Sequence, residues 1–222
     1  MIRIALGGVS NHSSAQGDPE DEVRVVKVAF GMKAHSGWAA LVVVGTRDGD
    51  FTVVDRRRIE LVEDEWAKQP YHAAEDMEAG AARDVVERGI EAAQRIAVRE
   101  MHAAVRREQE RKNEVTACAV LVANAMPDWS IEEILAVHFR MHKAEGVLFR
   151  DALVRATKAS GLRLVAIPEK LLTKHAERAL GSPASRLVER VATLGKFVGP
   201  PWGKDQKDSA LAAMIALQGD PQ

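Results

Sequence analysis

Apolar residues in the first third of the chain gather in three short runs, each with the length and composition of a β-strand. The runs cover residues 23–30, 37–45 and 51–62, and all three contain several Val residues. β-Branched residues favour strands, and the Gly/Asp segment "GTRDGD" after the second run favours a turn. Because the connections are short, we predict an antiparallel meander of three strands.

A helical pattern follows the three runs, from about Tyr71 to Lys112. Its apolar positions recur at the spacing of one helical face, with charged residues between them. Forty residues of helix would span about 60 Å, so we predict a break near Gly80 or Gly89. The charged residues predict a solvated face, and a homodimer contact through residues 71–112 is an alternative that the pattern leaves open.

The second half of the chain alternates between strand-like and helical segments. A continuous apolar run at 115–124 predicts a strand that is covered on both faces. After it we predict a helix that ends at Gly161, a strand at 162–168, two helices separated by Gly181, and a final helix. This order of elements predicts an α/β fold, with a mixed sheet, helices on both faces and a long helical segment after the third strand.

Composition bounds the class of protein without identifying a partner. The chain has 222 residues, of which 46% are hydrophobic and 28% charged, and its formal net charge is −1. These values are ordinary for a soluble globular domain. We predict one domain over residues 23–217, a flexible N-terminal arm at 1–22 and a tail at 218–222. No apolar run has the roughly 20 residues that a membrane helix needs, so no membrane partner is expected.

The single cysteine, Cys118, lies in the apolar run "ACAVLVA". One cysteine excludes an intramolecular disulfide and is typical of a reducing compartment, so we expect a cytoplasmic protein. Its apolar neighbours predict a small buried side chain rather than a reactive thiol.

Two carboxylates at the start of the final helix are the first candidates for chemistry. Asp205 and Asp208 stand at i and i+3 in "GKDQKDSALA", so a helix would present both to one side. Carboxylates are ligands that Mg²⁺ prefers, and two-metal phosphodiester hydrolysis depends on them. The charged cap of a helix is the alternative explanation.

The element order and the closing segment together resemble the ribonuclease H-like superfamily, in particular the RuvC-type Holliday-junction resolvases. The local resemblance covers residues 138–217. It comprises a helix that ends near Gly161, a strand that ends in Pro168, a Lys-containing helix, and "DQKDSALA" at 205–212, which is similar to the D-x-x-D-A-L-A element of the family. The resemblance implies that the two carboxylates of this element complete a site for Mg²⁺ or Mn²⁺.

Two of the four carboxylates that the resemblance calls for are absent. The family carries an Asp in the first strand, and counting back from Gly37 through "FGMKAHS" places Phe30 there. The family's Glu at the end of the fourth strand corresponds to Ala123 or Asn124. A pair of divalent cations held by two carboxylates lacks the negative charge that fixes such metals. The resemblance therefore implies a degenerate active site, and whether the chain is an enzyme stays open.

Polar residues between the first two predicted strands lie where the family places its substrate. Lys33, His35 and Ser36 fall in a predicted turn, and an ammonium, an imidazole and a hydroxyl suit a phosphate group. A polar hairpin turn, with Trp38 anchored in the core, explains the same residues without a ligand.

The segment "KFVGPPWGKDQKD" offers a similar choice. Lys204 and Lys207 suit a phosphate backbone, and Trp202 suits stacking on a base. Alternatively, the segment is a rigid connector in which Trp202 packs over the core.

Two further pairs of residues are candidate sites. His138 and His142 stand at i and i+4, a spacing that can bind a transition metal, although Phe139 stands where a zinc-protease helix would carry Glu. His72 and Glu75 stand at i and i+3 near a helix start. Exposed histidines and an N-terminal helical turn explain both pairs without a metal.

These observations predict a RuvC-like protein that binds nucleic acid or another phosphorylated ligand and has lost two-metal nuclease chemistry. The expected ligand-binding residues are Lys33, His35, Ser36, Trp202, Lys204 and Lys207. Asp205 and Asp208 are the expected weak ligands for Mg²⁺ or Mn²⁺, and the catalytic pair if the chain is active. Two alternatives stay open: a metal-dependent phosphodiester hydrolase with a rebuilt site, and a structural or interaction protein.

Overall fold

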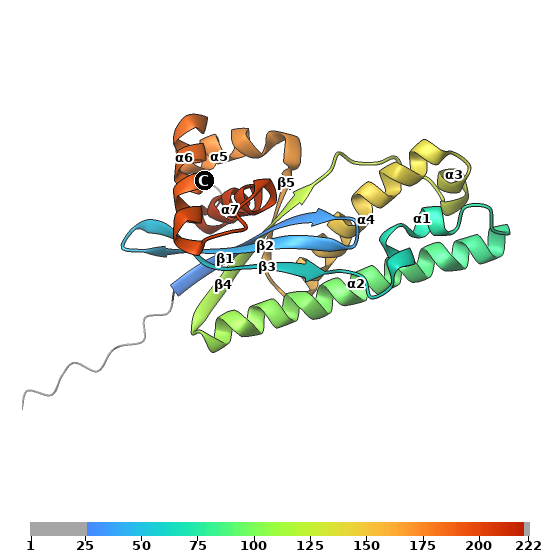
Figure 1. The fold of residues 1–222 in the computed structure, drawn as a ribbon, viewed down its shortest axis with the longest axis horizontal. Helices are drawn as coiled ribbons and strands as arrows, with labels where there is room; N and C mark the ends of the chain where they lie inside the picture. Colours follow the sequence, from blue (N-terminus) through green and yellow to red (C-terminus); the bar gives the residue numbers. More distant parts are fainter. Residues whose placement is uncertain (1–25, 220–222) are drawn as a thin grey trace, which may run out of the picture.

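A computed structural model describes residues 26–219, which form a five-stranded sheet covered by helices on both faces (Figure 1). The strands are β1 (Val26–His35), β2 (Trp38–Arg47), β3 (Asp50–Glu60), β4 (Asn113–Val122) and β5 (Arg163–Pro168). The α-helices are α1 (Pro70–Ala73), α2 (Ala79–Glu110), α3 (Ile131–Leu135), α4 (His138–Ala159), α5 (Leu172–Leu180), α6 (Ala184–Val198) and α7 (Lys204–Gln218). Two short 3₁₀ turns are η1 (Glu65–Lys68) and η2 (Glu169–Leu171). The predicted arm at 1–22 and the last three residues of the predicted tail lie outside the described residues.

The strand order across the sheet is β3-β2-β1-β4-β5. β1, β2 and β3 pair as an antiparallel meander, whereas β4 pairs in parallel with both β1 and β5. The parallel strands are connected through helices, as parallel pairing requires. This arrangement confirms the predicted mixed sheet with helices on both faces.

The first strand is longer than predicted and ends at His35 rather than Phe30. It pairs with β2 as far as His35 and Trp38, and with β4 as far as Lys33 and Leu121. Backbone hydrogen bonds to β2 on one side and β4 on the other keep the end of β1 extended up to a tight turn. Lys33 therefore lies within β1, and the prediction that placed it in a turn is wrong.

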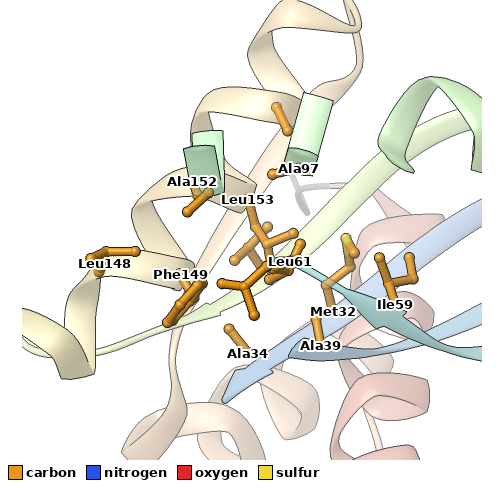
Figure 2. Packing of buried hydrophobic residues seen from close by; sticks show 14 of the residues in the cluster. Met32, Ala34, Ala39, Ile59, Leu61, Ala97, Leu148, Phe149, Ala152 and Leu153 are labelled. Carbon is orange, nitrogen blue, oxygen red and sulfur yellow. The ribbon is translucent and has the colours of Figure 1, made fainter. Parts of the chain in front are cut away.

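Alternate residues of β1 face two different helical layers, because side chains alternate across a strand. Phe30 and Met32 belong to the larger core, which packs against α2 and α4. Figure 2 shows Met32 and Leu61 from the sheet side meeting Phe149 and Leu153 of α4. The opposite face of the sheet is covered by α5, α6 and α7 (Figure 1).

α7 approaches the sheet most closely at Gly31. A Cβ at this position would lie 1.8 Å from the carbonyl oxygen of Ser209 and 2.8 Å from the amide nitrogen of Ala213. Only glycine permits backbone contact of this kind. The Ser209 hydroxyl also donates to the Ala40 carbonyl on β2, at 3.3 Å. These contacts fix the first turns of α7 over β1 and β2.

The long helix α2 is unbroken through Gly89, so the prediction of a break at that residue is wrong. The interruption lies at 74–78, before α2 begins, close to the other predicted position at Gly80. A Cβ on Gly89 would lie 2.5 Å from the Cβ of Pro70, so this glycine provides a close contact with α1 instead.

The Cys118 side chain is fully buried, as predicted, and burial raises the pKa of its thiol to about 12. Among the described helices, none combines the length and the apolar character needed to cross a membrane.

Candidate functional site

An ammonium group stands at the centre of three carboxylates near the carboxyl end of β1. Nζ of Lys33 lies 2.8 Å from Oδ2 of Asp208, 2.9 Å from Oε1 of Glu169 and 3.3 Å from Oδ1 of Asp205. The Lys33 side chain is only 6% exposed. We call these four residues the Lys33 cluster. Its cation occupies the place that a metal ion would take among the carboxylates.

The position of Lys33 follows from the strand. It lies two residues beyond Gly31, so it shares the α7 face of β1. α7 begins at Lys204, and the side-chain carbonyl of Gln206 caps the backbone N–H of Gly203 at 2.9 Å. Asp205 and Asp208 then lie on one side of the first two turns, as predicted from their spacing.

The third carboxylate, Glu169, was not predicted from the sequence. The strand registers align Lys33 with Leu121 of β4 and Leu121 with Ile167 of β5. Two strand spacings amount to about 10 Å, which a lysine and a glutamate side chain can bridge together. Glu169 directly follows β5, two residues beyond Ile167. The position of Glu169 immediately after a predicted parallel strand is the sequence feature from which it could have been predicted.

The pKa values of two members of the cluster confirm that its charges are coupled. Burial alone would lower the pKa of the Lys33 ammonium, but hydrogen bonds and charge from Asp208 and Glu169 outweigh burial and raise that pKa. Burial would raise the pKa of Glu169, but Lys33 and Arg150 outweigh it and lower that pKa. Both groups are therefore ionised around neutral pH.

Two further cations complete the charge balance of the cluster. Nζ of Lys204 lies 2.5 Å from Oδ2 of Asp208, and a guanidinium nitrogen of Arg150 lies 3.3 Å from Oε2 of Glu169. Lys33, Lys204 and Arg150 thus face three carboxylates, and the formal charges sum to zero. A divalent cation would have to displace Lys33, so the residues present do not fit the Mg²⁺ or Mn²⁺ site that the resemblance implies.

Phe30, the position that counting assigned to the missing acid, faces away from the cluster. Its side chain is fully buried in the core against α2 and α4, on the opposite side of the sheet from α7. The strand position beside Asp205 and Asp208 is that of Lys33. The count placed the strand end too early, because the turn after β1 is tighter than predicted.

His35 and Ser36 lie at the end of β1 and in the turn that follows. The His35 ring stacks on Trp38 with a centroid distance of 4.3 Å. Its Nε2 lies 3.1 Å from Oδ2 of Asp205, but the angle does not make a hydrogen bond. Both residues line a small cavity of about 210 Å³, which also reaches Glu145 and Arg150. His35 is therefore adjacent to the cluster, whereas no contact recorded for Ser36 joins it.

Two further predicted ligand-binding residues, Lys207 and Trp202, lie in different environments near α7. Lys207 is exposed and lines a groove of α5, α6 and α7 that also reaches Lys204 and Asp208. Among residues 26–219, no ion pair recorded for Lys207 joins it to the Lys33 cluster. The indole N–H of Trp202 donates to the Val191 carbonyl at 3.0 Å, and the ring packs directly on Gly195. These contacts favour the packed connector over a stacking platform, and a ligand-binding role for Trp202 stays a prediction.

A cleft of about 650 Å³ opens beside the Lys33 cluster, at the carboxyl ends of β4 and β5. Asn124 and Ala123, which stand at the predicted end of the fourth strand, line it. Its charged lining residues are Lys143, Arg150, Glu169, Lys170 and Lys204. Arg150 and Lys204 already pair with carboxylates of the Lys33 cluster, so Lys143 and Lys170 are the excess cations of this lining. Ligands of open α/β sheets bind outside the carboxyl ends of strands, where this cleft lies.

The strand order, the parallel β1–β4–β5 half and the two helical layers define a mixed α/β fold, as predicted. No family model matches the chain, and no curated protein matches it significantly in sequence.

Solved structures with a similar fold include RuvC of Thermus thermophilus, with a TM-score of 0.47, 13% identity, and coverage of 85% of this chain and 91% of that chain. RuvC of the same organism in complex with a Holliday junction substrate has a TM-score of 0.46, with the same identity and coverage. A Ppx/GppA family member from Aquifex aeolicus has a TM-score of 0.35 and 13% identity, and covers 70% of this chain and 39% of that chain. At these identities the likeness concerns the fold alone.

Proposed function

We propose that the chain binds nucleic acid through its phosphate groups in the cleft beside the Lys33 cluster, without two-metal cleavage. The observation that carries this proposal is the Lys33 ammonium, which lies within 3.3 Å of all three carboxylates of the cluster. An internal ammonium neutralises the acids that would otherwise bind a metal and repel a phosphate. The edge of the sheet then presents cations to its ligand.

The charge of the cleft supports an anionic ligand. Its four cationic side chains come from α4, η2 and α7. Lys143 and Lys170 are exposed and form no ion pair recorded for residues 26–219, so their ammonium groups can reach a ligand. Phosphate contacts from Lys and Arg supply most of the sequence-independent affinity of proteins for nucleic acid. The net formal charge of −1 for the whole chain does not oppose this, because the cations are concentrated at one edge.

The charge balance argues against the alternative of an active hydrolase with a rebuilt metal site. A metal ion would need Asp205 and Asp208 as ligands, and both carboxylates are engaged by Lys33. Binding would expel a buried ammonium from its three partners, at a cost of several kcal/mol. The hydrolase predicts metal-dependent cleavage that disappears in Asp208→Asn, and observing such cleavage would decide in its favour.

The binding experiment measures fluorescence anisotropy of labelled branched, duplex and single-stranded nucleic acids at several salt concentrations. The double variant Lys143→Gln/Lys170→Gln removes two cations from the cleft. Each lost phosphate contact should reduce the slope of log affinity against log salt by about 0.7–0.9, so a reduction of about 1.4–1.8 is expected for the two substitutions. A nucleoside triphosphate, added as competitor, distinguishes a small phosphorylated ligand from a polymer.

A matched control is the double variant Lys158→Gln/Lys196→Gln, which makes the same change in net charge at two exposed lysines outside the cleft. It should keep the wild-type salt slope. Equal losses in the two double variants would contradict a site in the cleft. No salt-sensitive binding to any nucleic acid would overturn the proposal and favour a structural or interaction protein.

A further inference from the structure

Three histidines from distant parts of the sequence meet where α1 packs against the start of α4. His72 lies on α1, and His138 and His142 lie one turn apart on α4. One ring nitrogen from each lies within 4.8 Å of the corresponding nitrogen of the other two. The ring centroids are 4.6 to 5.1 Å apart. We call these three residues the histidine cluster. It lies at the end of the molecule where α1, α3 and α4 come together (Figure 1).

A buried carboxylate fixes the orientation of His72. Oε2 of Glu145 lies 2.7 Å from Nδ1 of His72, and Oε1 accepts the backbone N–H of the same residue at 3.2 Å. An ionised carboxylate only accepts hydrogen bonds, so this contact selects the tautomer of a neutral His72 that carries its proton on Nδ1. Its Nε2 then carries a free lone pair. This carboxylate–histidine pair is the arrangement that typically orients a histidine ligand of zinc.

The negative charge of Glu145 has little compensation inside the protein. Its side chain is 4% exposed, and no Lys or Arg among residues 26–219 forms an ion pair with it. A buried charge is expensive unless it is paired. A cation bound on the far side of the His72 ring would provide that pairing.

The two histidines of α4 have the geometry of neighbouring ligands. Their Nε2 atoms lie 3.1 Å apart, and two nitrogens bound to one tetrahedral Zn²⁺ lie about 3.3 Å apart, given Zn–N bonds of about 2.0–2.1 Å. Nδ1 of His138 also lies 3.5 Å from Oε1 of Glu75. Two of the three rings therefore have a carboxylate at Nδ1 and can direct Nε2 toward a common point.

We propose that His72, His138 and His142 bind one Zn²⁺-class transition metal ion, with Glu145 and Glu75 as outer carboxylates. Three imidazoles favour Zn²⁺, Cu²⁺ or Ni²⁺ over Mg²⁺ and Ca²⁺, which prefer oxygen ligands. The two carboxylates balance the charge of the ion. His138 and His142 are exposed, so their rings have room to close on the metal, and the fourth coordination position faces solvent.

This metal site is separate from the Lys33 cluster and independent of the proposed nucleic-acid binding. Both sites contact α4, but His142 and Arg150 are eight residues apart on it, which amounts to a rise of about 12 Å. The metal would join α1 to α4. The site would then stabilise the loop region that leads into α2.

Zinc titration by calorimetry tests the proposal on the full chain, prepared without tag histidines. We expect one Zn²⁺ per chain, a rise in Tm on binding, and a tetrahedral visible spectrum with Co²⁺. His142→Asn should weaken binding by roughly 100-fold or more, because even loss of an outer carboxylate costs 10–100-fold. Glu145→Gln should weaken it within that smaller range.

The matched controls are His102→Asn and His175→Asn, two exposed histidines outside the cluster. Both should bind zinc like the wild type. His142 is exposed, so circular dichroism of the metal-free His142→Asn variant should match that of the wild type. No zinc binding at micromolar concentrations would overturn the proposal. So would equal loss in the cluster and control variants, or several weak ions per chain.

Discussion

The Lys33 cluster and the histidine cluster both gather potential metal ligands from distant segments, but they differ in charge. The first contains its own cation, since Lys33, Lys204 and Arg150 balance three carboxylates. The second places two carboxylates beside its imidazoles, and no Lys or Arg among residues 26–219 forms an ion pair with the buried Glu145. Ligand-type residues therefore do not define a metal site alone. The net charge at the point where the ligands converge decides whether a cation can bind there.

The largest expected effect on stability comes from removing the ammonium of the Lys33 cluster. Lys33→Met leaves three carboxylates together without their ammonium. The free energy of unfolding should fall by about 2–4 kcal/mol, somewhat below the cost at a fully buried pair because the carboxylates keep some contact with water. Mn²⁺ should restore part of the loss, since the acids are then free to bind it. Urea denaturation with and without Mn²⁺ measures both effects.

Lys207→Met is the control for this substitution, because Lys207 is exposed and forms no ion pair recorded for residues 26–219. Its unfolding free energy should stay within about 0.5 kcal/mol of the wild type. A Lys33→Met variant as stable as this control would show that the cluster does not depend on Lys33. Equal stabilisation of the wild type and Lys33→Met by Mn²⁺ would show that the ammonium does not exclude the metal.

A second substitution should disturb the Lys33 cluster and leave the histidine cluster intact. In Gly31→Ala the new Cβ would meet the Ser209 carbonyl at 1.8 Å, so α7 must move away from β1 and carry Asp205 and Asp208 with it. We expect a loss of about 1–3 kcal/mol in unfolding free energy, measured by urea denaturation. The histidine cluster lies on other elements, so zinc binding should be retained.

Gly146→Ala is the matched control for the second substitution. No atom lies within 4 Å of a Cβ at Gly146, which is inside α4. The alanine variant should be as stable as the wild type or more stable by up to about 1 kcal/mol, because alanine is the better helix former. Equal destabilisation of both variants would contradict the close contact between α7 and β1.

The order of elements and the mixed sheet could be predicted from the sequence because each depends on local patterns. Apolar runs define β2 and β4, and the i, i+3 spacing places Asp205 and Asp208 together. The role of Lys33 could not be predicted, because it depends on where β1 ends. A turn of two residues rather than a longer one moves this side chain from a loop into the sheet.

The third carboxylate and the third histidine depend on contacts between distant segments. Glu169 reaches Lys33 only through the registers of β1, β4 and β5. His72 meets His138 and His142 only because α1 packs on α4, and the sequence places them 66 positions apart. Spacing along one helix identified His138 and His142, but the third ligand and the supporting Glu145 follow from tertiary packing alone.

The smallest expected effect on stability is that of Glu169→Gln. Its stability, compared with that of the wild type during an acid titration, tests the charge balance of the Lys33 cluster. The pKa of Glu169 is lowered from 4.5, so its contribution to stability is present above that value and is lost as the pH falls through the folded-state pKa. Lys33, whose pKa is raised from 10.5, loses its contribution only at higher, alkaline pH. Between about pH 6 and 9 the variant should therefore be less stable than the wild type by a constant amount, roughly 1–2 kcal/mol for a charged hydrogen bond. Once the pH has fallen below the folded-state pKa of Glu169, the two denaturation curves should converge.

Glu65→Gln, at an exposed pair with Lys68, should show almost no difference at any pH. A gap that persists unchanged into acid would mean that Glu169 acts through packing, and the charge balance around Lys33 would then need another acid.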